Sequence, residues 1–481
     1  LYDREEVAID KPFTNWPTFS ATFTQPSATN FVIQTDQLIV HIALSNRFQV
    51  HFFMTNGAPL LEDGQTEYDL DYNPINDTNA YAQVNWPNES TSVSNLPSWF
   101  KLRSVKRSAT HETFFGLGDA GGPLRRNGRD YQFWAQDTYQ FGEYRNPKYT
   151  ALPMLYSLRK ASTNQSAVCY GLFFNNPARP VFKLSGTNGT WSFEAGDDQL
   201  DYFVFTGGAD HTMTKVVDRY TELTGRPVML PRWALGYHQS RHSYFSQQRV
   251  LNLARDLRTN DIPCDAIYLD IGAQQTFHGG APSFNPGAQP GQFTFNEDYT
   301  NVPGMVQAVG DLGMKLIPLV EPLIATNDPL YATAFSNLYF IKTNDLSTYV
   351  GSNFLGYISW LDFSIDETLT WWAGLLTNYV ASNGFEAIWN DLNEPNENEM
   401  PLDTIWYLQG RYGGGSVTND TRKWHSNNKN TYNVLESRMT YDALRVQNPD
   451  RRPFVLSRGA WPGVQKYAAG WSGDNKSSFD H

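Results

Sequence analysis

The sequence predicts an α/β plus all-β protein, with an N-terminal β-sandwich followed by a (β/α)₈ TIM barrel. Three observations support this prediction. The chain has 481 residues, more than one ordinary domain needs. Residues 1–228 alternate short apolar runs with clusters of Asn, Gly, Pro and Asp, as β-sandwiches do. Residues 229–481 alternate buried-type strands with helical segments, which favours a parallel sheet covered by helices.

The N-terminal domain is expected to be built from short strands. Representative strands are predicted at 30–34, 37–43, 48–53, 166–174 and 199–206. A helix is expected at 213–223, and the run Thr224-Gly225-Arg226-Pro227 breaks it. We therefore place the domain boundary at residue 228.

The second half contains about six βα units of the expected eight. Strands are predicted at 234–238, 266–270, 315–320, 386–389, 454–457 and 466–471. Helices are predicted at 246–259, 303–312, 367–382 and 432–447. Two long polar stretches, 272–300 and 395–431, exceed ordinary connections and are expected to be functional loops.

Composition excludes several classes of protein. The net charge of −12 leaves no excess of Lys and Arg for nucleic acid, and no apolar run is long enough to cross a membrane. Two cysteines, Cys169 and Cys264, exclude a disulfide scaffold and are expected to be buried free thiols. The 70 aromatic residues (14 Trp, 26 Tyr, 30 Phe) suit either stacking on sugar rings or packing of large β domains.

The sequence also suggests a secreted glycoprotein. It begins Leu1-Tyr2-Asp3, without an initiator Met or signal peptide, and so looks like a mature or trimmed form. Asn-X-Ser/Thr sequons occur at Asn76, Asn88, Asn164, Asn188, Asn419 and Asn475. We expect an extracellular location.

Acidic and basic residues end the predicted barrel strands. In barrel enzymes the catalytic groups lie at the C-terminal ends of the strands. These ends carry, in order, Tyr237, Asp270, Glu321, Asp391, Arg458 and Asp474. Several carboxylates around one mouth suit hydrolysis of a glycosidic bond, which needs an attacking carboxylate and a proton donor. The alternative for each carboxylate is a helix N-cap.

The local sequences around these residues resemble glycoside hydrolase family 31, which contains α-glucosidases and α-transglucosylases. The run 389–395 (Trp-Asn-Asp-Leu-Asn-Glu-Pro) is similar to the family's nucleophile signature, and 470–475 (Gly-Trp-Ser-Gly-Asp-Asn) is similar to its acid/base signature. Further similar segments, in chain order, are 115–118, 123–124, 231–237, 267–270 and 458–461.

The resemblance implies a role for each matching residue. Asp391 is the expected nucleophile and Asp474 the expected acid/base of a retaining mechanism. The residues expected to bind substrate are Asp270, Arg458, Trp389, Trp471, Leu392, Ile271, Tyr237 and Phe354. Glu321 and Glu394 are secondary candidates for carboxylate roles, and we expect each to be a structural partner. No metal or other cofactor is expected.

The sequence departs from the family pattern at four places. Leu392 stands where the family has Met, within the nucleophile signature. The runs 271–274, 354–356 and 429–433 also differ from the family's usual residues. The family places these three runs around the sugar, so linkage preference stays open.

Two other functions stay open. A transglycosylase would pass the glucosyl unit to a sugar acceptor instead of water, and a non-catalytic carbohydrate-binding subunit would retain only the pocket. The expected substrate is an α-gluco-oligosaccharide. Because two barrel strands are unaccounted for, we also expect a companion chain, derived from one processed precursor, that carries these strands, a substrate-binding His and C-terminal β domains.

Overall fold

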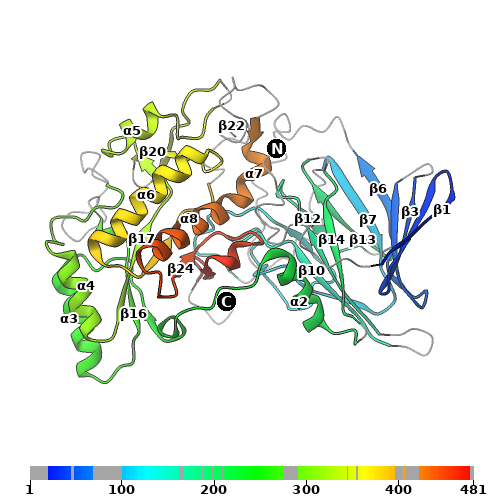
Figure 1. Cartoon of the computed structure of the whole chain (residues 1–481), viewed down its shortest axis with the longest axis horizontal. Coiled ribbons are helices and arrows are strands. Elements are labelled where there is room, and N and C mark those ends of the chain that lie inside the picture. The colour runs from blue at the N-terminus through cyan, green and yellow to red at the C-terminus, as the bar shows by residue number, and fades with distance from the viewer. Residues whose placement is uncertain are drawn as a thin grey trace.

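The computed structural model describes two packed parts, an antiparallel β region and a parallel half-barrel (Figure 1). The described residues are 20–44, 48–68, 100–142, 144–161, 167–186, 188–197, 199–208, 210–274, 291–343, 345–353, 356–395, 405–407 and 422–476. Phe354 and much of the two predicted long loops lie outside these ranges.

Three antiparallel sheets form the N-terminal part. The first contains β1 (Thr22–Ser27), β2 (Asn30–Gln34), β3 (Leu38–Ala43), β4 (Gln49–Met54) and β5 (Pro59–Leu61). The second has the order β6 (Asp63–Tyr68), β7 (Leu102–Arg107), β13 (Thr190–Ala195), β12 (Val181–Lys183) and β9 (Asp130–Gln132). The third has the order β14 (Tyr202–Thr206), β11 (Val168–Phe174), β10 (Met154–Arg159) and β8 (Glu112–Gly116).

Aromatic side chains fill the space between the second and third sheets. Phe114 on β8 packs edge-on against Trp191 on β13, and Phe174 contacts Phe193. Cys169, buried and free as predicted, belongs to the same core. Here the high aromatic content is explained by packing.

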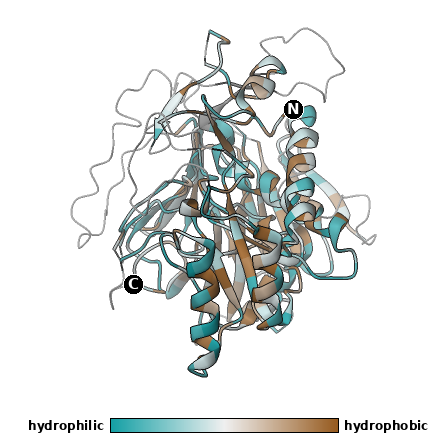
Figure 2. Cartoon of the chain, turned by 90° about the vertical axis from the view of Figure 1, so that its left-hand side faces the viewer, coloured by the Kyte–Doolittle hydropathy of each residue, from teal (hydrophilic) through white to brown (hydrophobic). Residues whose placement is uncertain are grey.

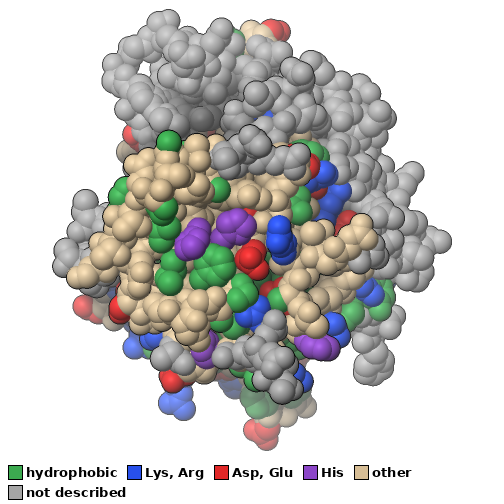
Figure 3. Space-filling model, turned by 90° about the vertical axis from the view of Figure 1, so that its right-hand side faces the viewer, with side chains coloured by type: hydrophobic (Ala, Val, Ile, Leu, Met, Phe, Trp, Pro, Cys, Tyr) green, Lys and Arg blue, Asp and Glu red, His purple; other side chains and the backbone are tan. Residues whose placement is uncertain are grey.

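The outer face of the first sheet is partly apolar. His41 and His51 are cross-strand partners, and both rings contact Phe53. In Figure 3, histidines gather beside hydrophobic side chains on the end of the molecule that the N-terminal part forms.

Six parallel strands form the second part, in the order of the sequence. They are β15 (His238–Gln239), β16 (Ala266–Leu269), β17 (Lys315–Val320), β21 (Ala387–Asn390), β24 (Phe454–Ser457) and β25 (Ala469–Gly470). Among the described residues the two outer strands, β15 and β25, each have one neighbour. The architecture is the predicted partial (β/α)₈ barrel.

Helices cover the outer side of this sheet. The covering helices are α3 (Gln247–Thr259), α4 (Val302–Asp311), α6 (Asp366–Asn383) and α8 (Tyr432–Gln447). Three other helices are α2 (Met213–Thr224), which precedes the barrel, and the short α5 (Tyr331–Ser336) and α7 (His425–Asn428). Figure 2 shows hydrophobic strands behind helices whose outer faces are hydrophilic. Small accessory sheets are β19 (Gly351–Asn353), β20 (Gly356–Trp360) and β18 (Leu323–Ala325), and β22 (Ile405–Tyr407) with β23 (Arg422–Trp424). No helix within the described ranges could span a bilayer.

The first predicted barrel strand is misplaced. Residues Arg232–Leu235 form a 3-10 helix, and the strand begins only at His238. Pro231 and Gly236 flank this turn of helix, and both favour a break in regular structure over a strand. The predicted strand at 466–471 is likewise shortened to Ala469–Gly470.

The two parts are joined by a buried polar contact. The side chain of Asn430 accepts a hydrogen bond from the backbone N–H of Ala135 (2.7 Å) and donates to the carbonyls of Phe133 (3.1 Å) and Pro177 (2.9 Å). Next to it, the ammonium group of Lys429 lies over the ring of Trp134. This departure from the family pattern, expected around the sugar, therefore serves the domain interface.

Candidate active site

The alternation of side chains along parallel strands builds the candidate site. Every second residue points into the barrel. Tyr268, Ile317, Ala387 and Phe454 form an apolar cluster there, joined by Trp389, Leu456 and Ala469. Two residues beyond the last apolar position of each strand, the same face carries Asp270, Glu321, Asp391, Arg458 and Trp471.

Strand pairing puts three of these residues in one row. Val320 is in register with Asn390, and Asn390 with Ser457. The ladder continues one residue further, because the N–H of Asp391 donates to Val320 and that of Arg458 donates to Asn390. Glu321, Asp391 and Arg458 therefore lie side by side on neighbouring strands.

Arg458 is the central cation of the site. Its guanidinium is 3% exposed and donates two hydrogen bonds of 2.8 Å to the carboxylate of Glu394. Its Nε lies 3.2 Å from Oδ1 of Asp391, and Nη2 lies 3.5 Å from Asp137. Glu394 is thus a structural partner that holds the guanidinium of Arg458, as we expected.

Asp391 is held in a defined orientation. Its Oδ1 accepts a hydrogen bond from the N–H of Leu392 (2.9 Å), whose backbone has a positive φ of 49°. Burial raises the pKa of Asp391, whereas Arg458 and the Leu392 N–H oppose that shift. The side chain of Leu392 packs against the main hydrophobic core.

Asp270 follows β16 and is separated from Asp391, which follows β21, by the single strand β17. Its Oδ1 accepts a hydrogen bond from Ile271 (2.6 Å), and Ile271 packs with Leu319 and Trp389. Burial, reinforced by Asp391 and Asp474, raises the pKa of Asp270 to about 7. At a pH near this pKa a large fraction of the carboxyl group is protonated, and the protonated form can both donate and accept hydrogen bonds.

Asp474 lies beyond the last described strand and contacts the N-terminal part. Its backbone carbonyl accepts a hydrogen bond from the N–H of Gln140 (2.6 Å). Partial burial raises the pKa of its side chain, with Asp137 adding to the shift and Arg458 and His242 opposing it. A raised pKa suits a proton donor.

Two aromatic side chains complete the inner wall. Trp389 packs edge-on against Trp471 and against Tyr268, with 5.5 Å between ring centroids in both pairs. Both tryptophans stand on the barrel-facing side, and their contact with substrate stays a prediction.

The structure does not bring Tyr237 to the mouth. Its carbonyl accepts a hydrogen bond from Asp265, before the start of β16, and its side chain is half exposed. Instead His242 lies near Asp474 and opposes the rise in the pKa of that carboxyl group. No strand period marks His242, because β15 ends at Gln239 and the backbone of Ser243 has a positive φ of 73°.

The N-terminal part contributes two residues that the sequence did not indicate. The hydroxyl of Tyr149 donates to Asp137 (3.1 Å), and its ring lies under the guanidinium of Arg458. Gly473, with a φ of +78°, allows close approach, since a Cβ there would lie 2.3 Å from the Tyr149 ring. No local pattern marks either residue, because their shared partner Arg458 is more than 300 positions away.

Metal binding finds no support in the described residues, where no three His, Cys, Asp or Glu side chains are grouped to hold an ion.

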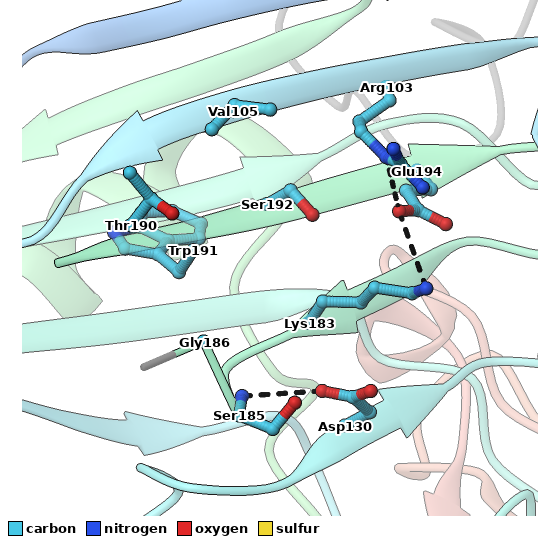
Figure 4. Close-up of a pocket in the computed structure, with 10 residues that line it drawn as sticks. All are labelled: Arg103, Val105, Asp130, Lys183, Ser185, Gly186, Thr190, Trp191, Ser192 and Glu194. Atoms are coloured by element: carbon cyan, nitrogen blue, oxygen red, sulfur yellow. Dashed lines mark hydrogen bonds and ion pairs between the residues drawn. The ribbon is translucent and has the colours of Figure 1, made fainter. Parts of the chain in front are cut away.

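A groove of about 290 Å³ lies on the outer face of the second sheet (Figure 4). In it Glu194 pairs with Arg103 (2.6 Å) and lies 3.7 Å from Lys183. The charges there compensate one another, in contrast to the carboxylate-rich barrel mouth.

Comparison with known proteins agrees with this arrangement. Residues 227–481 match the glycosyl hydrolases family 31 TIM-barrel domain, and residues 4–182 match the glycosyl hydrolase 31 N-terminal galactose mutarotase-like domain. The predicted boundary at 228 itself stays a prediction.

Individual relatives cover most of this chain. Alpha-glucosidase 2 of Bacillus thermoamyloliquefaciens is 31% identical over 376 residues, which are 76% of this chain and 44% of the relative. An alpha-glucosidase of Saccharolobus solfataricus is 25% identical over 400 residues, 77% of this chain and 52% of the relative.

A solved structure shares the fold of nearly the whole chain. The GH31 dextranase of Flavobacterium johnsoniae, complexed with glucose, superposes with a TM-score of 0.76 and 26% identity, covering 97% of this chain and 50% of the dextranase. The chain thus spans about half the length of the relatives that it matches. With family-model matches in both parts of the chain, it belongs to glycoside hydrolase family 31.

Proposed function

We propose that the enzyme carrying this chain is a retaining α-glucoside hydrolase that acts on the non-reducing ends of α-linked gluco-oligosaccharides. The observation that carries the proposal is the row of Asp391 and Arg458 at the barrel mouth, with Asp474 close enough to influence the pKa of Asp391. The similar alpha-glucosidases and the dextranase support α-glucosides as the substrate class.

In the proposed first step Asp391 attacks the anomeric carbon while the glycosidic oxygen leaves. Asp474 gives its proton to that oxygen, so the leaving sugar departs neutral and a glycosyl ester forms on Asp391. In the second step Asp474 removes a proton from water, which attacks the same carbon and frees Asp391. Two inversions retain the configuration.

Other groups assist this chemistry. Arg458 keeps Asp391 ionised, and Asp270 is placed to bind the hydroxyls of the sugar. Trp389 and Trp471 offer apolar faces to the ring. His242 and Asp137, which act on Asp474 from the strand β15 side and from the N-terminal part, would face the leaving group.

The test follows the anomeric configuration of the first product by proton NMR during hydrolysis of an α-linked glucose disaccharide. Release of α-glucose supports retention, whereas β-glucose would contradict it. The variant Asp391→Asn, which preserves side-chain volume, should lose activity by at least about 10³-fold. If this variant keeps substantial activity, the nucleophile is another residue.

Transfer to a sugar acceptor is the alternative outcome of the same mechanism. Attack on the glycosyl ester by a sugar hydroxyl instead of water would yield longer oligosaccharides. Chromatography of products at high substrate concentration distinguishes the two activities.

We further propose that strands from outside the described residues pair with β15 and β25. Each of these strands has one neighbour among the described residues, and unpaired strand edges with an open apolar interior are unfavourable. The strands would come from the remainder of the protein, either on the same polypeptide or on a companion chain produced by processing. Secretion also stays a prediction.

A further inference from the structure

Glu321 has no role in the mechanism above, yet it lies in the middle of the site. It follows β17 directly and stands in the same row as Asp391 and Arg458. Neighbouring parallel strands are about 4.8 Å apart, so its backbone is one strand spacing from that of Asp391. The residue is 0% exposed.

The carboxyl group of Glu321 lacks the partners that its neighbours have. Neither of its oxygens has a hydrogen-bond partner of good geometry among the described residues, although the amide of Gln292 lies beside it. Glu394, in contrast, receives two hydrogen bonds from Arg458. The guanidinium of Arg458 is thus shared among Glu394, Asp391 and Asp137, and within the described site it forms no ion pair with Glu321.

The surrounding charges oppose ionisation of Glu321. Asp391 and Asp270 face it from the adjacent strands, Arg458 acts on it from β24, and Glu436 on α8 is a further buried acid nearby. Burial, with Asp391 and Asp270 adding to it, raises the pKa of Glu321 well above its usual range, and Arg458 only partly opposes this. A buried, unpaired carboxylate costs several kcal/mol, whereas a neutral acid retains a donor that can be used.

The contacts that hold Asp391 within the described site converge on one of its two oxygens. The hydrogen bond from Leu392 and the ion pair with Arg458 both reach Oδ1. A hydrogen bond from a neutral acid to the carboxylate would favour the ionised form of Asp391.

We propose that Glu321 is a positioning residue that works as a neutral acid, donating its O–H to the carboxylate of Asp391 and so holding it ionised and oriented for attack. This proposal deepens the proposed function and rests on it. No proton is transferred: the hydrogen stays on Glu321 throughout the reaction.

Three variants of the complete enzyme separate a neutral acid from a carboxylate. Glu321→Gln keeps the shape and a hydrogen-bond donor but cannot ionise, Glu321→Leu removes the donor, and Glu321→Asp keeps the acid on a shorter side chain. With 4-nitrophenyl α-glucoside, Glu321→Gln should keep kcat within about 3-fold, and Glu321→Leu should lose about 10- to 100-fold with KM little changed.

The pH profile provides the readout that a purely structural role would not move. Activity at acidic pH requires ionised Asp391, so loss of a donor to its carboxylate raises the pKa of Asp391. The acid limb of kcat/KM should therefore move to higher pH in Glu321→Leu and stay in place in Glu321→Gln. The proposal fails if Glu321→Gln is as impaired as Glu321→Leu while Glu321→Asp is active, or if Glu321→Leu matches the wild type.

An infrared measurement tests the protonation state without any assay of activity. The spectrum of the wild type minus that of Glu321→Gln at neutral pH should contain the carbonyl stretch of a protonated carboxyl group. Carboxylate bands in its place would overturn the proposal, even if Glu321→Leu did not fold. If the wild type hydrolyses no α-glucoside but the carbonyl band is present, the proposed function fails while the neutral state of Glu321 is upheld.

Discussion

Individual residues in the barrel mouth combine burial with charge in ways that favour function over stability. Six acidic side chains lie around one cation, Arg458, in the described site: Asp137, Asp270, Glu321, Asp391, Glu394 and Asp474. Burial raises the pKa values of Asp270, Glu321, Asp391 and Glu394, which lowers stability at neutral pH. Perturbed carboxyl groups gathered at one end of a barrel are typical of catalytic sites.

Replacing Asp270 by Asn should make the destabilisation by a buried acid measurable. Its folded-state pKa of about 7 lies above the usual value for Asp, so the folded protein binds its proton more tightly than the unfolded chain. The free energy of unfolding of the wild type therefore falls as pH rises from about 4 to about 7. Asp270→Asn, which cannot ionise at this position, should not show that part of the fall.

The stabilisation by Asp270→Asn should grow over this pH range and then level off, at a few kcal/mol at most, given about 1.4 kcal/mol per pKa unit. Chemical unfolding at a series of pH values measures it. Asp256→Asn, on the exposed side of α3, is the matched control and should show no such growth. A pH-independent effect of Asp270→Asn would contradict the raised pKa.

Loss of the acid/base should depend on the leaving group. Asp474→Ala is expected to reduce hydrolysis of an unactivated disaccharide by about 10²- to 10⁴-fold. An activated aryl α-glucoside needs little protonation, so its first step should be spared, and added azide should yield an α-glucosyl azide. Equal loss on both substrates, or a β-azide, would assign Asp474 another role.

At the scale of elements, strand register and a domain contact place the catalytic groups. The segment from β9 to β10 leaves the second sheet and carries Asp137 and Tyr149 to Arg458. Asn430, in the 3-10 turn just before α8, fixes the beginning of that segment through two hydrogen bonds, and a third reaches Pro177. The geometry around Arg458 thus depends on a contact between two domains.

Asn430→Ala should weaken this contact. It leaves the N–H of Ala135 and the carbonyls of Phe133 and Pro177 without their partner, and an unsatisfied buried polar group costs about 1–3 kcal/mol. We expect a destabilisation of about 2–4 kcal/mol in chemical unfolding and a lower kcat. Asn378→Ala, on the exposed side of α6, is the control and should change neither. Unchanged stability of Asn430→Ala would show that the contact is dispensable.

At the scale of the whole molecule, the sheet is an incomplete barrel among the described residues. The edges at β15 and β25 each lack a second strand neighbour among the described residues, and the apolar side chains of Trp389, Leu456 and Ala469 on the barrel-facing side are only partly buried. A closed barrel would cover both.

Residues 1–481 produced alone should therefore aggregate or bind a hydrophobic dye, and lack activity. Co-production with the remainder of the protein should give a monodisperse, active species. Denaturing electrophoresis of the native enzyme then distinguishes the two arrangements, since a companion chain gives two bands and a continuous polypeptide gives one longer band. If residues 1–481 alone are monomeric, unfold cooperatively and are active, no further strands are needed.

The sequence alone determined the order of barrel strands and the positions of Asp270, Asp391 and Arg458 at their ends. These features are local: a period of two, short buried runs, and a polar residue where each run stops. The cores of β16, β17, β21 and β24 accordingly match their predicted ranges to within one residue.

Only the tertiary structure decided which more distant residues join them. His242, and not Tyr237, lies near Asp474, because β15 begins only at His238 and leaves Tyr237 before the start of the strand. Asp137 and Tyr149 reach Arg458 through domain docking, and among the described residues Arg458 pairs with Glu394 and not with Glu321. Contacts between residues hundreds of positions apart leave no periodic trace in one sequence, since they depend on how completed elements pack in space.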